Sequence, residues 1–190
     1  MPLAVLGGSF DPVHCGHVEM ARHILEHDLA RDVLVIPAYN SPLKTKTSAS
    51  AKHRLAMARL AFSDNPNCQV DEREILRGGP SFMIETLEQL HRQYPDRSLR
   101  LIMGADNVTD FSLWHRYRDI LALVRVLVLG RGDHQDHFSD DSHSSFIAVP
   151  GFDQRVSSTE IRAILASGQS AGDLLPAGVA GYIQSSGLYR

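Results

Sequence analysis

The feature that most constrains the fold lies near the start of the chain, where a strand pattern leads through a glycine loop into a helix pattern. Residues 3–6 form a short apolar run typical of a buried strand. Gly7 and Gly8 then permit a tight turn and a close approach of the backbone to a ligand. From His17 onward apolar residues recur at helical spacing. This order predicts an anion site, because free N–H groups and the positive end of the helix dipole face the loop.

Two histidines stand in this loop, where the anion would bind. His14 and His17 are three residues apart, and an imidazole donates a hydrogen bond to a phosphate oxygen or, when protonated, adds a positive charge. The loop lacks both the Gly-Lys-Ser/Thr ending of a P-loop and the G-x-G-x-x-G dinucleotide fingerprint. A metal site on His14, Cys15 and His17 lacks a further spaced set of ligands. A purely structural turn stays open as an alternative.

Composition sets the class of protein. A chain of 190 residues with 43% hydrophobic and 22% charged residues suits one soluble globular domain. The net charge of −3 argues against a general nucleic-acid or membrane surface. Two cysteines are too few for a disulfide framework, and the chain opens directly on its first apolar run. We therefore expect a cytoplasmic protein, for which a homo-oligomer is compatible with the sequence.

Short apolar runs alternate with helical patterns along the chain, as in a parallel sheet with crossover helices. Further strands are predicted at 32–36, 68–71, 99–106, 126–129 and 146–149. Helices are predicted at 51–62, from an N-cap at Ser81 to about Tyr94, and after Ser157 and Pro176. We expect a single α/β domain over 1–190, a doubly wound Rossmann-like parallel sheet with helices on both faces. The segment from about 151 would add a second phosphate motif and the C-terminal helices.

A second motif supports a phosphate ligand. Ser157 and Glu160 have the spacing of a capping box and so mark a helix start. The cap does not explain Ser158, Thr159 and Arg162, which together present hydroxyl donors and a positive charge at that helix start. These residues are suited to a polyphosphate.

The two motifs resemble those of a known superfamily. Residues 7–17 (GGSFDPVHCGH) are similar to the G-T/S-F-D-P-x-H-x-G-H signature of the nucleotidyltransferases, and residues 156–162 (VSSTEIR) to their I-S-S-T-x-I-R element. Residues 78–87, the single Trp114 and the ending at 175–189 resemble elements of the bacterial nicotinate-nucleotide adenylyltransferase family. Phe82, Met83, His115 and Leu43 depart from the usual residues of that family. Apart from Leu43, these departures concern the acceptor side.

The resemblance implies adenylyl transfer from ATP, with Mg²⁺, to the 5′-phosphate of nicotinic acid mononucleotide, with no covalent nucleophile and no metal ligand on the protein. His14, His17 and Arg162 would act on the phosphates, with His17 nearest the α-phosphate. The remaining ATP contacts would be Gly8, Ser9, Phe10, Gly104, Asp106, Ser158 and Thr159, with Asp106 on the ribose. Mononucleotide contacts would be Asn40, Lys44, Met83, Thr86, Trp114, His115 and Arg131, with Trp114 stacked on the pyridine.

Three alternatives remain open from the sequence. The acceptor could instead be nicotinamide mononucleotide or pantetheine phosphate. The chain could also be a binding protein that keeps a nucleotide pocket without turnover.

The histidine-rich segment 132–145 is interpreted as a solvated loop, with metal capture as its alternative.

Overall fold

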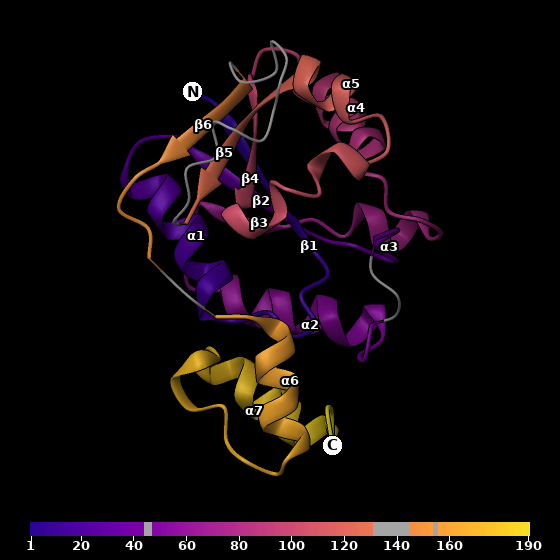
Figure 1. Ribbon diagram of the computed structural model, residues 1–190, viewed down its shortest axis with the longest axis vertical. Coiled ribbons are helices and arrows are strands. Elements are labelled where there is room, and N and C mark those ends of the chain that lie inside the picture. Colours follow the sequence, from indigo (N-terminus) through magenta and orange to yellow (C-terminus); the bar gives the residue numbers. More distant parts are fainter. Residues whose placement is uncertain (44–46, 131–144, 154–155) are drawn as a thin grey trace.

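The computed structural model describes residues 1–43, 47–130, 145–153 and 156–190. Within these residues six strands form one sheet in the order β3-β2-β1-β4-β5-β6, and every neighbouring pair is parallel (Figure 1). The strands are β1 (Leu3–Gly8), β2 (Asp32–Pro37), β3 (Cys68–Val70), β4 (Leu99–Gly104), β5 (Val124–Leu129) and β6 (Phe146–Val149). The order reverses between β1 and β4, which makes their carboxyl ends the point where such sheets bind ligands.

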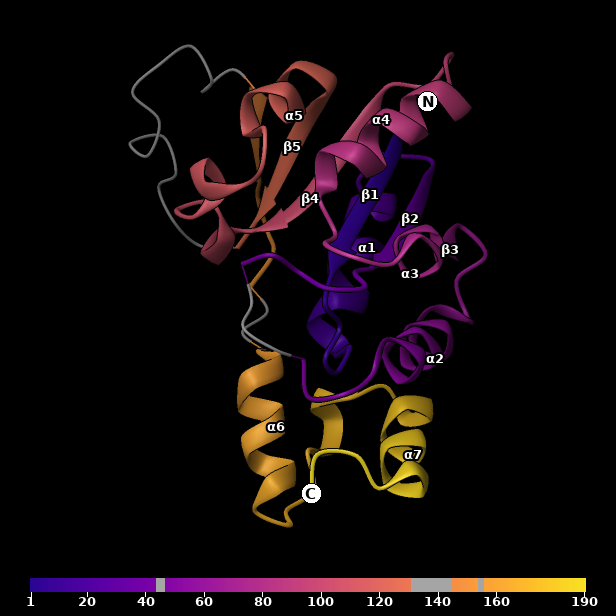
Figure 2. The same ribbon diagram turned by 90° about the vertical axis from the view of Figure 1, so that its right-hand side faces the viewer.

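Helices cover both faces of the sheet (Figure 2). The helices are α1 (Cys15–Glu26), α2 (Ala51–Phe62), α3 (Arg73–Arg77), α4 (Met83–Gln93), α5 (Tyr117–Leu123), α6 (Ser158–Ala166) and α7 (Ala177–Ser186), with 3-10 turns η1 (Ala105–Asn107), η2 (Phe111–Leu113) and η5 (Gly172–Leu174). Successive side chains of a strand point to opposite faces, so Leu6 joins one core with α1 and α2, while Val5 joins the other with α4 and α5. This arrangement confirms the predicted doubly wound Rossmann-like fold.

The C-terminal helices share the core of the α1 side. Ile161 of α6 and Val179 and Ile183 of α7 are buried in the same apolar cluster as Leu6. In Figures 1 and 2 these helices lie at the end of the molecule away from the N-terminus. The C-terminal helices therefore share a core with the sheet, and one domain over 1–190 stays a prediction.

All six predicted strands form, but the one predicted at 99–106 ends at Gly104, and Ala105 and Asp106 belong to η1. The structure also corrects the prediction at Ser81. Ser81 does not cap α4, because the N-cap is Phe82 and has no side-chain cap bond. The Ser81 hydroxyl instead accepts a hydrogen bond from the N–H of Tyr39 at 2.9 Å. Two short helices, α3 and α5, were not predicted, since five and seven residues are too few for a clear helical period. The Ser157 cap of α6 is confirmed, with its hydroxyl accepting from the N–H of Glu160 at 3.1 Å.

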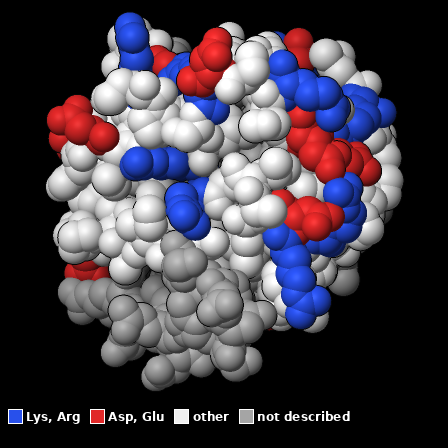
Figure 3. Space-filling view, turned by 90° about the horizontal axis from the view of Figure 1, so that it is seen from above, with Lys and Arg blue, Asp and Glu red and all other residues white. Residues whose placement is uncertain are grey.

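Two further properties follow from the described residues. None of their helices is both long enough and apolar enough to cross a membrane. On the face shown in Figure 3, basic and acidic side chains lie interspersed, without a broad field of one sign among the coloured residues.

Candidate active site

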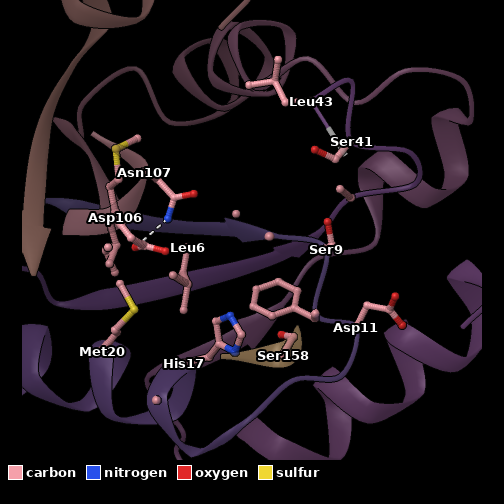
Figure 4. A pocket seen from close by; sticks show the side chains of 18 of the residues that line it. Leu6, Ser9, Asp11, His17, Met20, Ser41, Leu43, Asp106, Asn107 and Ser158 are labelled. Atoms are coloured by element: carbon pink, nitrogen blue, oxygen red, sulfur yellow. Dashed lines mark hydrogen bonds between the residues drawn. The ribbon is translucent and has the colours of Figure 1, made fainter. Parts of the chain in front are cut away.

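A cavity of about 1300 Å³ opens at the carboxyl ends of the central strands. Its wall includes Gly7 and Gly8 of β1, Gly104 of β4 and Leu129 of β5. Figure 4 shows residues from opposite sides of the cavity facing a common hollow, with His17 and Ser158 on one side and Ser41 and Leu43 on another. Pockets for one small ligand usually measure about 300–1,000 Å³, so the cavity has room for two substrates together.

Two helix N-termini meet at one end of this cavity. Gly16 and His17 of α1 line it together with Ser158 and Thr159 of α6. The Ser158 hydroxyl at the start of α6 donates to the carbonyl of Pro12 at 2.9 Å and so connects α6 to the loop that leads into α1. Because each N-terminus carries unpaired N–H groups and a positive dipole end, the pair forms an anion site.

His17 lies in this anion site with a defined orientation. Its Nδ1 accepts a hydrogen bond from the backbone N–H of His14 at 3.3 Å, which leaves the proton of the neutral ring on Nε2. The His14 ring stacks on it with a centroid distance of 3.7 Å, and the buried Phe10 ring meets its edge at 4.9 Å. Figure 4 shows His17 pointing into the hollow from α1. Packing therefore restricts His17 to a pose that suits a hydrogen-bond donor.

Ser9 adds a buried hydroxyl to the same wall. The residue is buried, and among the described residues no group forms a hydrogen bond with its Oγ. A buried hydroxyl without a partner costs free energy, so a ligand oxygen at this place would relieve the cost. The backbone of Gly8 and Phe10 flanks Ser9, and Phe10 has a φ of 49° that turns the chain toward α1.

Arg162 connects the second motif with the glycine loop. Its Nη1 donates to the carbonyl of Asp11 at 2.7 Å, and its Nη2 donates to the Thr159 hydroxyl at 3.1 Å. The side chain is only partly buried and lines the cavity. The guanidinium thus brings a positive charge to the two helix starts and is oriented by the loop itself.

Gly104 and Asp106 line the cavity at the end of β4. Asp106 is exposed on η1, and its Oδ1 accepts from the amide of Asn107 at 2.9 Å (Figure 4). A Cβ on Gly104 would lie 2.5 Å from the same Oδ1. Glycine is therefore the residue that lets this carboxylate fold back over the strand end, where it can accept hydrogen bonds from hydroxyl groups.

Aromatic rings form another part of the cavity wall. Trp114 and His115 line it, with Trp114 packed on Phe111 at 5.3 Å and His115 on Phe82 at 4.4 Å between ring centroids. Met83 begins α4 and lies so close over Gly7 that a Cβ there would collide with its methyl group. A flat aromatic ligand fits this part of the wall.

The other residues predicted for the mononucleotide lie in different places. Thr86 is fully buried and donates its hydroxyl hydrogen to Glu74, so it lies behind a residue that lines the cavity. Asn40 is exposed and forms a backbone bridge with Pro80, beside the cavity residue Ser41. Lys44 and Arg131 lie outside the described residues, as does 132–144.

The structure places a buried cation, Arg54, behind the glycine loop, where the sequence left open both a reach to that loop and the more common surface position. Arg54 of α2 is 1% exposed and donates to the carbonyls of Ser9, Ala38, Tyr39 and Ala49 at 2.6 to 3.2 Å. Burial lowers the pKa of its guanidinium, and the charge of Asp11 opposes that shift. An arginine in an amphipathic helix usually lies on the surface. The sequence alone does not show that these carbonyl groups surround Arg54.

Glu74 is a second buried charge that the sequence did not mark. It is 2% exposed, and its burial raises the pKa of its carboxyl, against the hydrogen bonds from Thr86 and Ser81. Because the pKa of Glu74 is higher in the folded state than in the unfolded state, its protonated form stabilises the fold at low pH. This contribution to the free energy of unfolding is lost as the pH rises through the folded pKa.

Glu74→Gln is therefore expected to gain stability relative to the wild type as the pH rises from 4 to 8. The glutamine side chain carries no charge and keeps an oxygen to accept from Thr86. Urea unfolding at several pH values measures the difference. Asp28→Asn, on the exposed turn that follows α1, serves as the control with a flat difference. A constant difference for Glu74→Gln would show that the carboxyl is charged across this range.

The described residues contain no group of three or more His, Cys, Asp or Glu side chains placed to hold a metal ion. A Mg²⁺ ion does not need such a group of side chains, because it keeps several waters and binds through substrate phosphates with one or two carboxylates. The wall of this cavity is compatible with a Mg²⁺ ion that arrives on the phosphates of a nucleotide.

Comparison with known proteins identifies the family. The cytidylyltransferase-like family model matches residues 5–164. A probable nicotinate-nucleotide adenylyltransferase of Gemmatimonas aurantiaca is 41% identical over 100% of this chain and 93% of its own length, and one of Roseiflexus castenholzii is 39% identical over 98% and 96%.

A solved structure shows the same fold. Nicotinic acid mononucleotide adenylyltransferase of Plasmodium falciparum, complexed with NaAD, superposes with a TM-score of 0.77 at 17% identity, covering 99% of this chain and 97% of that one. The family model and the full-length relatives place the chain in the nicotinate-nucleotide adenylyltransferase family of the cytidylyltransferase-like nucleotidyltransferases.

Proposed function

We propose that this protein transfers the adenylyl group of ATP to nicotinic acid mononucleotide, forming nicotinic acid adenine dinucleotide and pyrophosphate. One observation carries the proposal: a single cavity joins an anion site at two helix starts to an aromatic part of its wall at Trp114 and His115. A triphosphate suits the first part and a pyridine ring the second. The relatives named above support the same acceptor.

In the proposed reaction, an oxygen of the mononucleotide 5′-phosphate attacks the α-phosphorus of ATP. The bond from that phosphorus to the bridging oxygen breaks, and pyrophosphate leaves. No proton has to be removed from the attacking phosphate oxygen, so no general base is needed. The protein accelerates the step by holding both phosphates in line and by stabilising charge on the phosphate oxygens.

Different residues are proposed to bind the different parts of the two substrates. The Nε2–H of His17 and the N–H groups from Gly8 to Phe10 are proposed to contact the α-phosphate, with the Ser9 hydroxyl as a further donor. The β- and γ-phosphates are assigned to Ser158, Thr159 and Arg162, and the ATP ribose to Asp106. His14 lines the same cavity and stacks on the His17 ring, and it is proposed to act on the same phosphates. On the acceptor side, Trp114 and His115 would border the pyridine, and the N–H groups at Met83 would bind its carboxylate.

Mg²⁺ is proposed to enter as part of the ATP substrate. It supplies positive charge to the phosphates and to the departing pyrophosphate. The chain's own cationic contribution among the described cavity residues is Arg162.

Pyrophosphate release tests the function directly. We expect turnover with ATP, Mg²⁺ and nicotinic acid mononucleotide, and much slower turnover with the nicotinamide mononucleotide. The physical reason is that backbone N–H donors at Met83 pair with a carboxylate and would face the NH₂ group of the amide. Equal rates or a preference for the amide would overturn the acceptor assignment. Absence of turnover with either, followed by turnover with pantetheine phosphate, would move the enzyme to another branch of the superfamily.

A further inference from the structure

The carboxylate of Asp11 is occupied by the protein itself. It accepts hydrogen bonds from the N–H of Ser48 at 2.6 Å and of Ala49 at 3.0 Å, and from the hydroxyl of Tyr189 at 2.7 Å. Asp11 is 5% exposed. Although the residue belongs to the glycine loop, its charge is directed to the chain rather than to a phosphate or a metal.

Tyr189 reaches this carboxylate from the far end of the chain. Gly187 ends α7 in the left-handed conformation, and Tyr189 itself has a φ of 63°, so the chain turns back after the helix. The tyrosine is half-buried, and burial together with the Asp11 charge raises the pKa of its hydroxyl. The hydroxyl therefore stays protonated and remains a donor.

The backbone of the same residue holds a proposed phosphate ligand. The carbonyl of Asp11 accepts from Arg162 Nη1 at 2.7 Å, while the neighbouring Ser158 hydroxyl donates to the carbonyl of Pro12. Asp11 is thus fixed through its side chain by Tyr189 and the start of α2, and through its carbonyl it orients Arg162. A shift of the Asp11 peptide would move the guanidinium together with the loop.

We propose that Asp11 and Tyr189 are positioning residues for adenylyl transfer, which act by holding Arg162 and the glycine loop in register. This inference rests on the proposed function. It gives Tyr189 a part in the reaction although this residue does not contact the substrate. Small displacements of a reacting geometry cost up to about 100-fold in rate, and one lost hydroxyl contact should cost a fraction of that.

Tyr189→Phe tests the proposal, with Arg190→Ala as the matched control. Arg190 is exposed, and its guanidinium contacts the carbonyl of Gln184 at 3.4 Å. We expect kcat to fall about 10-fold in Tyr189→Phe while KM for the mononucleotide stays within about 2-fold, and both constants to stay at wild-type values in Arg190→Ala. The assay runs well below each variant's Tm, so that a merely structural role would leave kcat unchanged.

A double-mutant cycle with Arg162→Lys examines the route of the effect. If Tyr189 acts through Arg162, the double variant loses less than the product of the two single losses, whereas multiplicative losses would overturn the route. Asp11→Asn is the second variant if Tyr189→Phe does not fold, because it weakens the same contact from the loop side. The same fall in kcat is expected, and wild-type kcat in either folded variant would overturn the proposal.

The wild-type assay separates this inference from the function on which it rests. Wild-type protein without turnover of any acceptor would refute the proposed function. Wild-type turnover with an unchanged Tyr189→Phe variant would refute the positioning role alone.

Discussion

Replacing His17 with alanine is expected to lower kcat at least about 100-fold, the magnitude found when one donor to a developing oxyanion is removed. The His14 N–H holds Nδ1 of His17, so the ring presents Nε2–H from a fixed pose against Phe10. Such a donor costs no reorganisation when charge develops on the α-phosphate. Alanine removes this donor and also the capping hydrogen bond that Nδ1 accepts from the His14 N–H at the start of α1.

Steady-state kinetics with saturating ATP and mononucleotide measure this effect. His91→Ala is the control, because His91 is exposed on α4 and does not line the cavity. We expect its kcat to equal that of the wild type. His17→Gln should retain part of the activity, because its amide still donates a hydrogen bond. Near-normal turnover in His17→Ala would remove His17 from the reacting end of the site.

Arg54→Met is expected to be the most destabilising single change, at about 3–5 kcal/mol of the free energy of unfolding. Methionine fills the space of the alkyl chain but donates no hydrogen bond. The carbonyls of Ser9, Ala38 and Tyr39 would lose their bonds from the guanidinium, and the nearby Asp11 would lose the charge that faces it. Because Ser9 and Tyr39 follow β1 and β2, the loss falls on the strand ends that carry the cavity.

Urea denaturation compares this variant with Arg59→Met. Arg59 lies on the same helix, and its exposed side chain pairs with Glu72 at 2.8 Å. An exposed ion pair contributes at most about 1 kcal/mol, so the control should unfold near the wild-type midpoint. Similar midpoints for both variants would show that the carbonyl groups around Arg54 find other donors.

Local sequence patterns determined the order of the elements and one side of the site. An apolar run, two glycines and a helical period predict strand, loop and helix from neighbours in the chain, and Ser157 with Glu160 marks the start of α6 in the same way. The resemblance then assigned His14, His17, Ser158, Thr159 and Arg162 to the phosphates. The structure brings these residues to one end of one cavity, and their roles remain predictions.

Only the tertiary structure decided what supports that site. Arg54 is buried because carbonyls from two strand ends converge on it, and Asp11 is satisfied by donors 37, 38 and 178 residues away. Thr86 lies behind Glu74, a residue of the cavity wall, because its hydroxyl donates to that carboxylate. Periodicity reports which face of an element is apolar, but a buried charge depends on partners supplied by distant segments. Those partners meet only when the sheet has formed and the C-terminal helices have packed against it.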